Sequence, residues 1–180
     1  MGEITMWTAQ HRRVLETLRQ ADIYFVKREY VEQKYQEASW VFREAYSYFT
    51  KQAMRRMTKP DQAESPIWLF RDSKWAVKDE QTALIKLEIP EAEILFFDMK
   101  KWNKILNLSY IGDGDAFEKK LLKMGVTDPL DIFSKPYFPL LKKEVTDSWS
   151  SVFQTDGIAP QYIQGAAWQL KNAWIDEVIF

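Results

Sequence analysis

The sequence predicts one α+β domain over residues 1–180, with a mixed or split β-sheet flanked by helices. Hydrophobic residues make up 46% of the chain and charged residues 28%, which is typical of a globular protein. Strand-type segments lie at both ends of the chain, and helical periodicity dominates between them. No repeat, low-complexity tract or linker divides the chain, so the strands at the two ends must meet in one sheet.

Short runs of alternating, β-branched or aromatic residues predict the strands. These runs occupy residues 4–8, 23–31, 66–71, 83–89 and 94–97. Two closing strands, at 162–170 and 174–180, could pair as a hairpin around Lys171 and Asn172. The weakest of these predictions is 83–89, because Leu84 and Ile85 are adjacent and leave its buried face ambiguous.

Apolar residues at spacings of three and four predict the helices. These helices span residues 9–21, 33–58, 99–107 and 139–153, and another runs from Asp115 to Gly125. Thr8, Asp98 and Asp115 are the side chains expected to cap helix N-termini, and Asp128-Pro129 starts a further short turn of helix. As a cap, Asp98 needs no catalytic role.

Composition excludes several classes of site. The chain has no cysteine and a single histidine, His11, so thiolate metal sites, a Cys nucleophile and a two-His metal site are excluded. Its 6 glycines complete neither dinucleotide-binding nor P-loop phosphate motifs. We expect no metal, no membrane span and no signal peptide, and the absence of cysteine permits a reducing, cytoplasmic location.

Polar residues near the two ends of the chain are the candidate site residues. Trp7, Thr8, Gln10 and His11 lie where the first strand runs into a helix, a junction that can face a pocket. The alternative is that Thr8 caps the helix and Trp7 is core. His11 is the one candidate imidazole for general base catalysis.

Gln164 interrupts an otherwise apolar strand. An unpaired buried amide costs about 1–3 kcal/mol, so Gln164 either pairs with backbone or faces a pocket. The sequence leaves both possibilities open.

Clusters of basic residues raise the possibility of a nucleic-acid surface. They include Lys51/Arg55/Arg56/Lys59, Lys100/Lys101/Lys104, Lys119/Lys120/Lys123 and Lys142/Lys143. Exposed aromatic rings beside them could stack the bases of single-stranded RNA. The net charge of −1 favours the alternative, in which each cluster is the solvated side of a helix.

Landmarks along nearly the whole chain resemble an uncharacterised bacterial family, a domain of unknown function. These landmarks are Trp7-Thr8-x-Gln10, Pro66-Ile67-Trp68, Leu87-x-Ile89-Pro90, Leu95, Asp98, Trp102, Leu106-Asn107, Trp149, Phe153 and Gln164. The resemblance implies no established activity.

The layout of strands and polar residues also resembles, more distantly, the ADP-ribosyltransferase fold. The resemblance implies NAD as cofactor, with Thr8 or Gln10 holding the nicotinamide ribose or amide and Trp7 or Trp68 stacking on nicotinamide. Gln164 would occupy the first position of a closing Gln-x-Glu motif that stabilises positive charge on the ribose. Position 166 is Ala, so the carboxylate of that motif is missing and the implied activity is weak, altered or absent.

Three functions follow as hypotheses. The first is an ADP-ribosyltransferase-like domain that binds NAD or another nucleotide ligand, with Gln164, Gln10 and His11 as catalytic candidates. The second is a mobile-element-encoded inhibitor of host defence (anti-CRISPR-like) or a toxin that binds or cleaves RNA. The third is a non-enzymatic module that binds a host protein through exposed Trp and Tyr.

Overall fold

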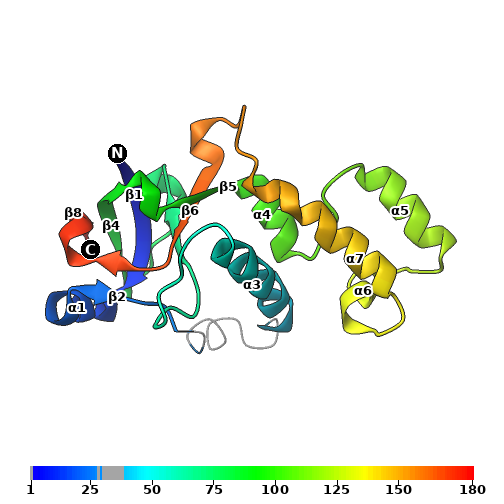
Figure 1. Ribbon diagram of the computed structural model, residues 1–180, viewed down its shortest axis with the longest axis horizontal. Coiled ribbons are helices and arrows are strands. Elements are labelled where there is room, and N and C mark those ends of the chain that lie inside the picture. Colours follow the sequence, from blue (N-terminus) through cyan, green and yellow to red (C-terminus); the bar gives the residue numbers. More distant parts are fainter. Residues whose placement is uncertain (1, 28, 30–38) are drawn as a thin grey trace.

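A six-stranded antiparallel sheet organises the domain, with helices on both of its faces (Figure 1). The computed structural model describes residues 2–27, 29 and 39–180. The strand order is β5-β6-β3-β1-β4-β8, and a separate two-stranded sheet pairs β2 with β7. A single α+β domain is therefore confirmed, whereas the mixed sheet is not, because each neighbouring pair of strands is antiparallel.

The strands and helices have the following bounds. The six sheet strands are β1 (Glu3–His11), β3 (Ile67–Phe70), β4 (Thr82–Pro90), β5 (Leu95–Asp98), β6 (Ile163–Ala167) and β8 (Ile175–Ile179). The small sheet contains β2 (Ile23–Tyr24) and β7 (Leu170–Lys171). The described helices are α1 (Arg12–Ala21), α3 (Ser39–Met54), α4 (Met99–Leu106), α5 (Gly114–Lys123), α6 (Asp131–Ser134) and α7 (Pro139–Ser148), and short 3-10 segments include η2 (Ser73–Trp75), η4 (Trp149–Phe153) and η5 (Pro160–Tyr162).

The sheet is nearly split between β1 and β3. Among the described residues the ladder between these strands consists of the single pair Trp7↔Phe70, whereas β1 and β4 pair from Glu3↔Pro90 to His11↔Thr82. Beside the single pair, the hydroxyl of Thr8 donates to the backbone carbonyl of Trp68 at 2.9 Å. This bond joins the two strands beside the point where their ladder is interrupted.

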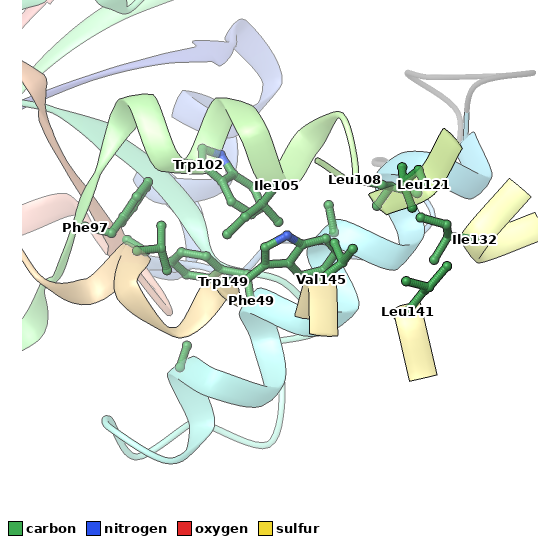
Figure 2. Close-up of a cluster of buried hydrophobic side chains, with 14 of the residues drawn as sticks. Phe49, Phe97, Trp102, Ile105, Leu108, Leu121, Ile132, Leu141, Val145 and Trp149 are labelled. Carbon is green, nitrogen blue, oxygen red and sulfur yellow. The ribbon is translucent and has the colours of Figure 1, made fainter. Parts of the chain in front are cut away.

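Two hydrophobic cores lie on opposite faces of the sheet. One core lies between the sheet and α1, and it includes Met6, Leu18, Leu69, Ile85 and Trp174. The other face packs on α3, α4 and η4 over the β5-β6-β3 half of the sheet. Figure 2 shows this second core running from Phe97, Phe49 and Trp102 beside the sheet to Leu121, Ile132 and Leu141 among the outer helices. Because each strand alternates its side chains, neighbouring residues belong to different cores.

Several predicted boundaries need correction. The helix predicted at 9–21 begins at Arg12, because residues 9–11 continue the ladder with β4 and stay extended. His11, not Thr8, caps it. The helix predicted from Asp115 to Gly125 is α5. Its N-cap is Asp113 rather than Asp115, since the Asp113 side chain accepts the backbone N–H of Ala116.

Other predictions are confirmed in part. The strand predicted at 23–31 is β2 with an isolated bridge at Val26, and residue 28 and residues 30 and 31 lie outside the described residues. The helix predicted at 33–58 is α3, which ends at Met54 rather than at residue 58, and residues 33–38 also lie outside the described residues. In β4, Ala83, Ile85, Leu87 and Ile89 are buried, which resolves the ambiguous face.

The predicted closing hairpin is wrong. β6 inserts between β3 and β5, whereas β8 pairs with β4 on the opposite side of the sheet. Between them the chain pairs β7 with β2 and buries Leu170 and Trp174 in the α1-side core. Burial of these apolar side chains across the sheet competes successfully with the local turn at Lys171 and Asn172.

Candidate functional site

One row of side chains crosses the split in the sheet. The register opposes Trp7 to Phe70, Phe70 to Gln164, and Gln164 to Phe97. Directly opposed residues share a face of a sheet, so these four side chains lie in a line on the face covered in part by α3 and α4. Trp7 and Phe70 are half-buried, whereas Gln164 and Phe97 are buried.

Gln164 carries a buried acceptor with no partner. Its side chain is 7% exposed, and its Oε1 atom is buried without a hydrogen bond. A buried amide oxygen left unpaired costs about 1–3 kcal/mol, so the fold retains this residue at an energetic loss. The register places this acceptor beside the aromatic rings of Phe70 and Phe97. A ligand group that donates a hydrogen bond would recover the loss.

Thr8 and Gln10 do not join Gln164. Gly165 shares its face with Met6 and Leu69, since a Cβ on Gly165 would meet both residues. Thr8 and Gln10 alternate with Met6 along β1 and therefore lie on that face, opposite to Gln164. The predicted cavity shared by Thr8, Gln10 and Gln164 is thus absent from the described structure.

The hydrogen bonds of Thr8 and Gln10 point to a structural role. Thr8 is 1% exposed, and its hydroxyl donates to the Trp68 carbonyl. Gln10 Nε2 donates to the Thr8 hydroxyl at 2.8 Å. Thr8 therefore links β1 to β3, and Gln10 donates to the hydroxyl that makes this link.

Trp68 lies on the face of Gln164, but neighbouring rings surround it. Trp68 opposes Ala166 across the β3–β6 ladder. Its ring centroid lies 4.9 Å from Phe49, 5.0 Å from Trp102 and 5.4 Å from Tyr46. Stacking on a ligand would have to displace these contacts, so Trp7 is the better candidate of the two predicted platforms.

His11 stands apart from the row. It is exposed at the end of β1, and its Nδ1 atom accepts the backbone N–H of Arg13 at 3.2 Å. This bond caps α1 and occupies one ring nitrogen. The geometry therefore does not unite His11 with Gln164.

Two rings and two lysines flank the N-terminal end of β6. The Nζ atom of Lys100 lies 4.2 Å from the ring centroid of Tyr162, and that ring lies 6.4 Å from the ring of Trp75. Lys74 lies 5.4 Å above the Trp75 ring and 3.0 Å from Asp72. The hydrogen bonds from Lys74 hold the pKa of the Asp72 carboxyl below its usual value. We call Lys74, Trp75, Lys100 and Tyr162 the rim.

A separate cavity of about 690 Å³ lies between α3 and α7. Lys142 and Glu44 pair across it at 3.2 Å, and Trp149 packs edge-on against Tyr48. Burial raises the pKa of the Tyr48 phenol. None of the described side-chain atoms that are buried without a partner lies among its lining residues, so nothing there indicates a particular ligand.

Sequence reasoning did not identify Phe70, Tyr162 and Lys100 as neighbours of the Gln164 strand. Phe70 was within a predicted strand, but only the register shows that it links Trp7 to Gln164. Lys100 was recognised as part of a basic cluster, and its position over Tyr162 depends on the pairing of β5 with β6.

No helix among the described residues has the length and apolar character needed to cross a membrane.

Comparisons with known proteins identify a family. No curated protein and no solved structure was found to match the chain. A family model with the description "Domain of unknown function (DUF3841)" matches residues 5–176. The chain therefore belongs to this family, the domain of unknown function DUF3841.

Proposed function

We propose that this domain is ADP-ribosyltransferase-like and binds NAD, with the nicotinamide ribose against Gln164 and the nicotinamide ring beside Trp7. The observation that carries the proposal is the buried, unpartnered Oε1 of Gln164. NAD fits this acceptor because its ribose hydroxyls and its carboxamide both donate hydrogen bonds. The neighbouring Trp7 and Phe70 rings supply apolar surface for a planar ring.

The strand order supports the proposal. Counted along the chain, the first, second and fifth strands of the main sheet (β1, β3 and β6) are neighbours. The resemblance drawn from the sequence requires the opening strand and the Gln164 strand to come together at one site. In the sheet β3 lies between these two strands, and the register aligns Trp7 of β1, Phe70 of β3 and Gln164 of β6 in one row.

The residue at position 166 limits the chemistry. Ala166 is 2% exposed on the face of Gln164, within the same core as Trp102. When the bond between the ribose and the nicotinamide of NAD is cleaved, positive charge develops on the ribose. Gln164 can accept a hydrogen bond from a ribose hydroxyl, but it carries no charge to offset that positive charge. Loss of one such stabilising group costs on the order of 10²–10³ in rate, so we propose binding with weak or altered turnover.

The test compares the wild-type protein with Gln164→Leu and with Gln161→Leu as a matched control. Gln161 is an exposed glutamine just before β6. We expect millimolar NAD to raise the thermal midpoint of the wild type and of Gln161→Leu, and the rise to disappear in Gln164→Leu. Because leucine removes the unpaired acceptor, Gln164→Leu should also be as stable as the wild type without ligand, or about 1 kcal/mol more stable.

Two results would reject the proposal. One is the absence of any NAD effect on the wild type. The other is a Gln164→Leu variant that keeps the full NAD effect. Strong destabilisation of Gln164→Leu without ligand would instead show that the amide has a partner inside the fold.

A further inference from the structure

Lys100 lies at the same end of β6 as the unpartnered amide. It is in the first turn of α4, directly after β5, which pairs with β6 through Phe97↔Gln164 and Asp98↔Ile163. Its ammonium group is 4.2 Å from the ring of Tyr162, two residues before Gln164. The pairing of β5 with β6 therefore brings a cation to the edge of the Gln164 row.

The charge of Lys100 is not neutralised by the protein. Lys100 is exposed, and no carboxylate of the described residues forms an ion pair with its Nζ atom. Asp98, the nearest acid in sequence, is 4% exposed, and its carboxylate accepts the backbone N–H groups of Lys100 and Lys101. The helix terminus is thus already capped, and the ammonium group is the remaining donor at this position.

The other lysines nearby are already engaged. Lys101 Nζ donates to the backbone carbonyl of Ser151 at 2.9 Å. Lys74, beside the Trp75 ring, pairs with Asp72. Of the two lysines of the rim, Lys100 is the one without a carboxylate partner among the described residues.

We infer that Lys100 binds the phosphate groups of the ligand whose ribose contacts Gln164, so the domain selects a phosphorylated nucleotide over the corresponding nucleoside. This inference rests on the proposed function. An ammonium group is a strong partner for phosphate. The ring of Tyr162 below it limits the positions that the flexible lysine side chain can take.

The experiment measures dissociation constants by calorimetry for NAD and for nicotinamide riboside, which lacks phosphate. The variants are Lys100→Ala, Lys100→Arg and Lys104→Ala. Lys104 is an exposed lysine one turn later on α4 and serves as the matched control. We expect Lys100→Ala to weaken NAD binding about tenfold and to leave nicotinamide riboside unchanged. Lys100→Arg should retain most of the NAD affinity, and Lys104→Ala should behave as the wild type.

The outcomes separate this inference from the proposed function. If NAD binds the wild type and Lys100→Ala equally, or if Lys100→Ala weakens both ligands by the same factor, phosphate recognition by Lys100 is wrong while NAD binding stands. If neither ligand binds the wild type, the proposed function fails. The inference would also be overturned if the wild type binds a single-stranded RNA oligomer but not NAD, and Lys100→Ala no longer binds that RNA.

Discussion

At the scale of single residues, the domain contains side chains that its own fold leaves unsatisfied. Gln164 is buried with an unpaired acceptor, whereas the nearby Thr8 and Gln10 pair with each other and with backbone. The sequence singled out all three residues but could not decide which face of the sheet each one occupies. One step along a strand reverses the face, so the register had to be known first.

The packing around Gly165 restricts the size of the residue at this position. An added Cβ would lie 2.7 Å from Ile94 Cγ2 and 2.9 Å from Met6 Cε. We predict that Gly165→Ala lowers the free energy of unfolding by about 1–3 kcal/mol, because the β-branched Ile94 has little freedom to move away. Chemical denaturation measures the effect.

The control for this prediction is Gly2→Ala. A Cβ on Gly2 meets nothing within 4 Å, so its stability should match that of the wild type. A Gly165→Ala variant as stable as Gly2→Ala would show that the α1-side core is looser than the structure indicates.

At the scale of elements, caps and periodicity were predictable, but strand ends were not. Asp98 caps α4 as the sequence predicted, and Trp102 and Ile105 are buried on its inner face. β1, by contrast, runs three residues beyond its predicted end, because its partner β4 continues to pair with it. A capping side chain can be recognised from the residues next to it in the sequence. The length of a strand depends on its partner strand, which for β1 lies about 70–90 residues away along the chain.

The cap on α4 gives a prediction at this scale. Asp98 accepts backbone N–H groups at 2.8 Å and 3.3 Å. We predict that Asp98→Ala lowers the free energy of unfolding by about 1–2 kcal/mol, because it leaves these two donors near the end of β5 without their acceptor. Asp98→Asn keeps an oxygen in place and should lose much less. Urea denaturation of the two variants side by side measures the difference, and equal losses would contradict the capping role.

At the scale of the whole molecule, the order of strands determines which residues can act together. The fold class was predictable because the sequence shows strand patterns at both ends and in the middle of the chain, together with helical periodicity. The insertion of β6 between β3 and β5, and the pairing of β8 with β4, were not predictable. These arrangements depend on burial of side chains such as Leu170 and Trp174, whose partners are far away in sequence.

This arrangement explains why the candidate site was only partly predicted. Trp7 and Gln164, both recognised in the sequence, do share a face, and they are connected through Phe70. Thr8 and Gln10 lie on the opposite face, and His11 caps a helix. The site thus combines two predicted residues with a third that only the strand order reveals.

The most direct test is an NMR titration that follows the side-chain amide signal of Gln164, assigned by its loss in Gln164→Leu. We predict that added NAD shifts this signal in a saturable manner and leaves the side-chain amide of Gln161 unchanged. A Gln164 signal that stays in place while NAD binds elsewhere, or that does not respond to NAD at any concentration, would contradict the account.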